Sequence, residues 1–401
     1  MPNNSPIYRA KPKRKGKHGR RFLRVFLVIS ILIIALHITL PWILLTVANK
    51  KMKNMPDYIG HLDGLQMNMF AGSMTFIGFS LQKKGGKIPV PFMDIQKTKV
   101  TIDWKALFKG KLVSVVAVDD FVVNFVKGPT KATSQSKLDK SWMDFADKIL
   151  PLDINRLKLN NGEVHYMDYH SSPKIDLLLN KIFVVGENLS TVRDTSKILP
   201  ANVKLTANAY GGTLAANLNL APLEKIPTFD INAELKSLPL TYLNNFLKAY
   251  AKIDVQKGWF SVYMEAAAKD GLIKGYAKPF IKDLDVINDK ERKGMPFKEQ
   301  VIESLVEVAA WIFKDKKYDR LATNIKFEGS LMKPDISIWG IIGEALINAF
   351  VGSLIPSLEN SINIEAIGTK NDKNFLEKIF DPDKKKKDKH KKKKKKTAKN
   401  K

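Results

Sequence analysis

The clearest grouping of residues that could do chemistry is the stretch HYMDYH at 165–170, where two histidines flank an aspartate. A shared metal would need its ligands on one side of the backbone. In a continuous strand, residues of opposite parity point to opposite faces, so His165 and His170 diverge. Asp168 and His170 share a face, but two ligands do not complete a site. The pattern favours polar residues on a strand, and we expect no metal and no cofactor.

Motifs for catalysis are not found elsewhere in the sequence. The chain has no cysteine, which excludes a disulfide scaffold, a thiol nucleophile and Cys-ligated metal centres. It contains no Walker A loop, no G-x-G-x-x-G after a strand, no G-x-S-x-G and no H-E-x-x-H. Catalytic groups scattered along the sequence would escape such a search. We nevertheless expect that the protein is not an enzyme.

The positive charge of the chain lies mainly at its two ends. The formal net charge is +27 over 401 residues. Residues 1–24 carry nine Lys or Arg and no acid, Lys50, Lys51 and Lys53 add three, and residues 384–401 carry thirteen Lys and one Asp. The body between is therefore nearly neutral, which argues against a basic groove for nucleic acid.

One segment near the N-terminus is apolar enough to cross a membrane. Residues 25–49 contain no formal charge, and about 20 apolar residues suffice to span the hydrocarbon layer. The excess of cations before this segment predicts a cytoplasmic N-terminus. The alternative is a cleaved signal peptide, with 46–48 (TVA) as a loose cleavage site, but its apolar region is usually only ~7–15 residues long. We expect a retained single-pass transmembrane helix.

Beyond this segment, apolar and polar residues alternate with a period of two. Four stretches show the pattern most clearly, at 203–209, 214–220, 229–235 and 260–264. Such alternation is typical of strands with one apolar face, and consecutive short strands favour an antiparallel sheet. The pair Gly211-Gly212 predicts a hairpin between the first two stretches. The fold class predicted is mainly β with flanking helices.

Several segments between and after these strands have other patterns. Helical periodicity is found at 240–251 and 297–314, and 128–141 is a polar, turn-rich linker. Residues 336–356 are read as an amphipathic helix, although they are long enough for a second span. Glu344 opposes the second span, because a carboxylate at mid-bilayer costs roughly 2.5–3.5 kcal/mol. The lysine-rich end, 376–401, is either a solvated disordered tail or a contact for anionic lipid headgroups.

The apolar strand faces have two interpretations. They are the core of a closed sandwich, or they line an open groove for lipid acyl chains. In the second case the wall residues, which share one parity within each strand, are Leu205, Ala207, Leu214, Ala216, Leu218, Phe229, Ile231, Ala233, Phe260 and Val262. Periodicity alone does not choose between the two.

Several stretches resemble the AsmA-like proteins of Gram-negative envelopes, in the branch long labelled a domain of unknown function. They are 41–45 (PWILL), 58–62 (YIGHL), 78–81 (GFSL), 102–113 (IDWKALFKGKLV), 154–168 (INRLKLNNGEVHYMD), 238–240 (LPL), 243–244 (LN) and 271–275 (GLIKG). The resemblance extends over about residues 22–370, and these motifs are structural rather than catalytic.

The resemblance implies an inner-membrane anchor followed by a long, curled antiparallel sheet in the periplasm, similar to bridge-like lipid-transfer proteins. The implied organisation is a basic cytoplasmic tail at 1–24, the transmembrane helix at 25–49, the periplasmic β-domain at 57–375 and the lysine-rich tail. The implied function is lipid transport or outer-membrane maintenance. The implied partners are a phospholipid or another envelope lipid, the membrane, and an outer-membrane or envelope protein. The alternative is a membrane-tethered β-sandwich that scaffolds envelope assembly and carries no lipid.

Overall fold

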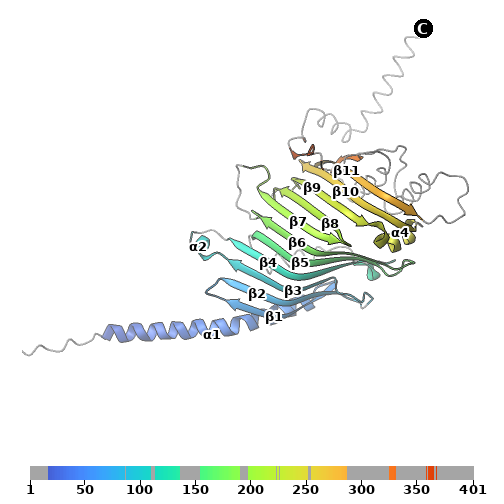
Figure 1. The fold of residues 1–401 in the computed structure, drawn as a ribbon. Coiled ribbons are helices and arrows are strands. Elements are labelled where there is room, and N and C mark those ends of the chain that lie inside the picture. The colour runs from blue at the N-terminus through green and yellow to red at the C-terminus, as the bar shows by residue number, and fades with distance from the viewer. Residues whose placement is uncertain are drawn as a thin grey trace, which may run out of the picture.

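The computed structural model describes one long helix, one large sheet and the short elements between the strands (Figure 1). The described residues are 17–85, 87–109, 113–135, 154–189, 197–222, 224, 226–251, 254–286, 325–330, 358, 360–364 and 367. The segments expected at 297–314, 336–356 and 376–401 lie outside these residues, as does the second half of the expected linker at 128–141.

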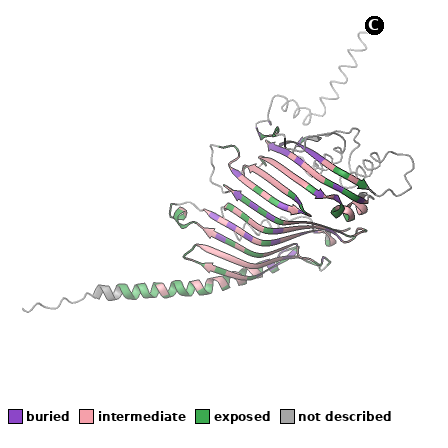
Figure 2. Cartoon of the chain, in the orientation of Figure 1, coloured by how far each residue is buried: buried purple, intermediate pink, exposed green. Residues whose placement is uncertain are grey.

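Helix α1 (Lys17–Lys53) contains the predicted apolar segment and extends beyond it at both ends. It continues through Pro41, at which the pyrrolidine ring removes one backbone donor. Its segment Phe22–Lys53 is long and apolar enough to cross a membrane, and the most apolar part is not buried (Figure 2). These properties suit either a transmembrane helix or a signal sequence.

The strands form one twelve-stranded sheet in which every strand lies beside its neighbours in sequence. Their bounds are β1 (Tyr58–Asn68), β2 (Ser73–Lys83), β3 (Met93–Ile102), β4 (Ser114–Lys127), β5 (Ile154–Asp168), β6 (Ile175–Glu187), β7 (Ala201–Ala209), β8 (Gly212–Leu220), β9 (Phe229–Pro239), β10 (Val255–Lys269), β11 (Leu272–Val286) and β12 (Ile325–Ser330). The shorter elements are α2 (Trp104–Leu107), η1 (Lys131–Thr133), η2 (Leu240–Leu243) and α4 (Asn244–Ala251). The mainly β fold and the helix at 240–251 agree with the sequence analysis.

The sheet is neither curled nor antiparallel throughout, and these two parts of the expectation were wrong. Strands β4 and β5 pair in parallel, whereas every other neighbouring pair is antiparallel. A parallel pair needs a crossover connection, and the linker at 128–141 lies in that connection. A smaller correction concerns the hairpin between β7 and β8. Its two turn residues are Tyr210 and Gly211, both with positive φ, and Gly212 already pairs with Ala209.

A line of backbone irregularities crosses the first half of the sheet. Positive φ angles occur inside the strands at Gly78, Asp120, Asn161 and Lys181, in β2, β4, β5 and β6. The residues that share a face change parity at these positions, since Val118 and Phe121 on either side of Asp120 belong to one buried cluster. At these positions the register shifts only where β5 pairs with β6 and where β6 pairs with β7. The alternation of these strands is therefore not strict, whereas β7 and β8 pair without any shift of register.

Candidate functional site

One face of the sheet is apolar from the first strand to the last. Residues directly opposite each other on paired strands point to the same face, so the register defines rows across the sheet. The first apolar row consists of Met67, Met74, Val100, Val116, Leu157, Gly186, Val203, Leu218, Ile231, Ala266, Gly275 and Phe327. It takes one residue from each of the twelve strands, and none of them is polar.

A second apolar row runs beside the first and is interrupted by a single hydroxyl. It consists of Leu65, Phe76, Thr98, Val118, Leu159, Val184, Leu205, Ala216, Ala233, Met264 and Ala277. We call the surface defined by these two rows the apolar face. With strands about 4.8 Å apart, eleven spacings give it a length of about 53 Å along the sheet.

The opposite face carries mostly polar side chains at the intervening positions. From β1 to β11, the row between the two apolar rows consists of Gln66, Thr75, Lys99, Ala117, Lys158, Val185, Lys204, Asn217, Asn232, Glu265 and Tyr276. Asn202 donates a hydrogen bond across this face to Asn217, at 2.8 Å. The sheet is thus amphipathic, which suits one wetted and one apolar-facing side. At β10 and β11 the polar row is itself buried, because Glu265 and Tyr276 have almost no exposed surface.

All ten residues predicted from the sequence belong to strands β7–β10 and point to the apolar face. Leu205, Ala216 and Ala233 belong to one row, Leu218 and Ile231 to the other, and Ala207 lies opposite Leu214. Phe229 faces Leu220 and Ala268, and Val262 faces Leu235. Ala207 is buried and the other nine are half-buried.

Phe260 differs from the other predicted residues in its surroundings. It packs in a cluster with Leu243 and Leu247, which belong to η2 and α4. The chain's own helix therefore covers the apolar face at this position, and Phe260 is not part of an open wall. The remaining nine predicted residues are not members of that cluster, but five of them pack in two other buried clusters, namely Phe229 and Ile231 in one and Leu205, Ala207 and Leu214 in the other.

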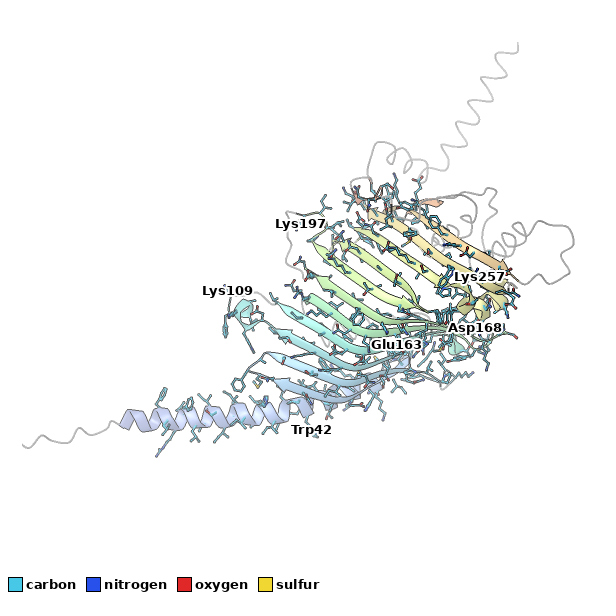
Figure 3. All side chains as sticks on the ribbon, viewed as in Figure 1. Trp42, Lys109, Glu163, Asp168, Lys197 and Lys257 are labelled. Atoms are coloured by element: carbon cyan, nitrogen blue, oxygen red, sulfur yellow. The ribbon has the colours of Figure 1, made fainter. Side chains whose placement is uncertain are left out.

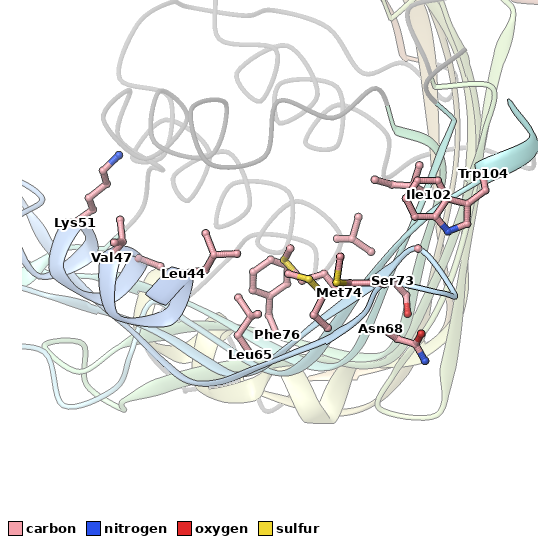
Figure 4. Close-up of a pocket in the computed structure, with 15 residues that line it drawn as sticks. Leu44, Val47, Lys51, Leu65, Asn68, Ser73, Met74, Phe76, Ile102 and Trp104 are labelled. Carbon is pink, nitrogen blue, oxygen red and sulfur yellow. The ribbon is translucent and has the colours of Figure 1, made fainter. Parts of the chain in front are cut away.

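A pocket of about 510 Å³ opens at the start of the apolar face (Figure 4). Leu65, Met74 and Phe76 form its floor, and Leu44 and Val47 of α1 lie across from Trp104. The lining residues are almost all apolar, with Lys51, Asn68 and Ser73 as exceptions. The pocket therefore joins the apolar helix to the apolar face.

The end of α1 is fixed to the first strand beside this pocket. The Asn49 side chain donates to the Leu62 carbonyl at 2.9 Å and accepts from the Leu62 amide at 2.8 Å. Met52 is buried against Gly60, where a Cβ atom would come within 3.0 Å of the Met52 Cβ. The end of the helix is thus firmly attached to the sheet. Cleavage after residue 48, as for a signal peptide, would remove Leu44, Val47 and Ala48 from the pocket lining.

A polar cluster around the buried Asp168 lies at the opposite strand ends, where β4, β5 and α4 meet. The Tyr250 hydroxyl donates to Asp168 Oδ2 at 2.6 Å, and the Lys127 ammonium lies 4.0 Å from the same carboxylate oxygen. Burial raises the pKa of Tyr250, and the hydrogen bond to Asp168 raises it further. Burial lowers the pKa of Lys127, partly offset by the Asp168 charge. This cluster attaches α4 to the ends of the strands.

The histidines of the HYMDYH stretch do not share a site. The Nδ1 atom of His165 lies 2.8 Å from Asp176 Oδ1, whereas His170 contributes its backbone amide to Asp168 Oδ1, at 2.9 Å. Asp168 also accepts from the Ser171 amide, so its carboxylate closes a turn. Within the described ranges, no group of three or more His, Asp or Glu side chains is placed to hold a metal ion.

Sequence reasoning missed the pocket and the first half of the apolar face. In β4, the apolar-face residues are Val116 and Val118 before the bulge at Asp120, and Phe121 and Val123 after it. This change of parity hides the alternation, although a shift from even to odd apolar positions is itself a signal of a bulge. No pattern in the sequence indicates the contact between α1 and strands β1–β3, because it joins residues of separate elements.

Comparisons with known proteins do not assign this chain to a family. Neither a scan against protein-family models nor a search of curated proteins found a match. The resemblance to AsmA-like proteins therefore stays a prediction from the sequence, and the functional argument depends on the geometry of the sheet.

Proposed function

We propose that this protein is a membrane-anchored lipid carrier whose apolar sheet face holds acyl chains, in lipid transport or outer-membrane maintenance. The observation that supports it best is the pair of apolar rows, of which the first continues across all twelve strands. A sheet that served only as half of a small core would not need an apolar face about 53 Å long. In this proposal the acyl chains lie along the apolar face and the headgroups stay in water.

The energetic advantage of such a surface is large. Moving about 30 methylenes of a two-chain lipid through water costs on the order of 24 kcal/mol, at about 0.8 kcal/mol each. Contact with an apolar wall removes most of this barrier and requires no reaction. The proposal therefore fits a protein without enzymatic activity and without a cofactor.

The proposal includes α1 as a retained anchor, with the N-terminus in the cytoplasm and the sheet in the periplasm of an AsmA-like inner-membrane protein. Retention is supported by the pocket, since Leu44, Val47 and Ala48 of α1 form one of its walls. Lipid leaving the bilayer along α1 would meet the pocket before the rest of the apolar face. An outer-membrane or envelope protein is proposed as the partner at the other end.

The alternative is a membrane-tethered scaffold that carries no lipid. The packing of Phe260 under η2 and α4 favours it locally, because protein covers the apolar face there. Extraction of the full chain in a mild detergent, followed by native mass spectrometry and lipid analysis, distinguishes the two. The carrier predicts co-purifying phospholipid, whereas its absence under conditions that preserve the fold would favour the scaffold.

A further inference from the structure

The two most exposed aromatic side chains among the described residues lie in two turns at the same edge of the sheet. Phe70 is 87% exposed in the turn between β1 and β2, and Phe108 is 86% exposed immediately after α2. Trp104 and Leu107 of α2 are exposed as well, as are Lys105 and Lys109. We call these six residues the edge patch. Large aromatic side chains exposed in this way usually mark a contact surface.

The two turns of the edge patch form one structural unit. The Ile102 amide donates to the Gly72 carbonyl at 2.8 Å, which joins the end of β3 to the β1–β2 turn. Gly72 has a φ of +59°, and a Cβ atom there would come within 2.6 Å of the Trp104 indole nitrogen. The rings of Trp104 and Phe108 lie 6.3 Å apart.

The one-turn helix α2 is itself held by the N-cap residue that precedes it, Asp103. The Asp103 carboxylate accepts from the Lys105 amide at 2.8 Å and from the Ala106 amide at 3.2 Å. This N-cap satisfies two donors that a short helix would otherwise leave without partners. The exposure of the aromatic rings is therefore a property of an ordered turn.

Helix α1 passes the edge patch on its way out of the sheet. Its C-terminal end is bonded to Leu62, and its residues Leu44 and Val47 share the pocket with Trp104. Helix and strand thus run antiparallel, and the N-terminal part of α1 extends beyond the edge that carries α2 (Figure 1). Lys109 lies at this edge in Figure 3, whereas Asp168 and Lys257 lie at the opposite edge.

We propose that the edge patch is a second membrane contact, inserted into the interface of the bilayer that holds α1. This inference depends on the proposed function only in taking α1 as a membrane anchor. Aromatic rings are preferred at the level of the headgroups, and neighbouring lysines attract anionic lipids. The occupant is the bilayer, because the patch is next to the exposed apolar helix and combines aromatic rings with Lys105 and Lys109.

The contact would fix the orientation of the sheet relative to the membrane. A single helix leaves the attached domain free to tilt, whereas a helix and a patch together define which edge faces the lipid. The pocket has Trp104 in its lining, so it would open next to the headgroups. An acyl chain would then pass from the bilayer to the apolar face with little exposure to water.

The absence of cysteine allows a direct test with single labels. The full chain carrying Phe70→Cys or Phe108→Cys would be labelled with a polarity-sensitive fluorophore. It would then be reconstituted in vesicles of phosphatidylethanolamine and phosphatidylglycerol that contain a spin-labelled lipid quencher. The matched control is Tyr242→Cys, since Tyr242 is 59% exposed and follows β9 at the opposite edge.

We expect emission at shorter wavelength and strong quenching at positions 70 and 108, with neither at 242. Equal, water-like emission at all three positions would overturn the proposal. A shift at 108 without quenching would also overturn it. If, in addition, unlabelled Phe108→Cys chains form a disulfide with each other under an added oxidant, the occupant is a second copy.

The result is independent of lipid carriage. Quenching at 70 and 108 without co-purifying phospholipid would support the edge patch and reject the carrier. Co-purifying phospholipid without quenching would support the carrier and reject the edge patch as a membrane contact. Extraction at alkaline pH measures separately whether α1 stays in the bilayer.

Discussion

A single charge placed on the apolar face should abolish much of its affinity for lipid. The best position is Leu218, which belongs to the first apolar row and lies opposite Val203 and Ile231. It is half-buried, so a carboxylate there keeps access to water and the fold should tolerate Leu218→Asp. The carboxylate would stand where the proposal places an acyl chain.

The expected magnitude follows from the area that one leucine offers. Full burial of a Leu side chain stabilises a complex by about 1.5–3 kcal/mol. Because Leu218 is already partly covered, we take the lower end, about 1.5 kcal/mol, which corresponds to about a tenfold loss of affinity. An acyl chain packed against the carboxylate would also displace some of its water, and this desolvation adds to the loss of affinity. We therefore expect Leu218→Asp to retain at most about a tenth of the wild-type affinity.

The adjacent residue provides the matched control. Asn217 points to the polar face, and its Oδ1 accepts a hydrogen bond from Asn202. Asn217→Asp adds the same charge one residue away and keeps that acceptor. Binding of a fluorescent phospholipid to both variants, with thermal unfolding to check the fold, measures the difference. Equal lipid binding by Leu218→Asp and wild-type protein would refute the assignment of acyl chains to this face.

Three further predictions concern stability. Tyr250→Phe leaves the buried Asp168 without its 2.6 Å hydrogen bond, so we expect a loss of about 1–3 kcal/mol and faster hydrogen exchange in α4; unchanged exchange would mean that the bond does not hold the helix. Gly162→Ala would bring a Cβ atom within 1.9 Å of the Phe121 ring, so we expect a lower unfolding temperature that Phe121→Leu partly restores; no change in either variant would contradict the close packing. Glu265 is buried and accepts from the Ser361 amide at 2.9 Å and the Ile362 amide at 3.0 Å, so Glu265→Gln should raise hydrogen exchange at 361 and 362 and leave β7 and β8 unchanged.

The sequence predicted the elements whose pattern is local. The apolar segment at 25–49 lies inside α1, and the four alternating stretches lie inside β7, β8, β9 and β10. Strands β7 and β8 pair without any shift of register, so Leu214 and Ala216 lie on one face as their alternation predicts, whereas the pairing of β9 with β10 shifts between Phe260 and Val262. The helix at 240–251 was also found, because its apolar residues follow the period of a helix.

Other features could not be predicted, because they arise from contacts between distant residues. Parallel pairing of β4 with β5 depends on the crossover between them, not on the strands themselves. Packing of Phe260 under α4 depends on where the β9–β10 connection turns, and the attachment of Tyr250 to Asp168 joins residues 82 positions apart.

Composition and period thus determined that this chain has an apolar helix and two-faced strands, since both properties repeat within a few residues. The tertiary structure decided that the apolar faces of all twelve strands align in continuous rows and that a pocket joins α1 to the first strands. It also placed the backbone irregularities of β2, β4, β5 and β6, at which the apolar positions change parity. Alignment between strands is set by register, and register is fixed by hydrogen bonds and turns that link residues far apart in the chain.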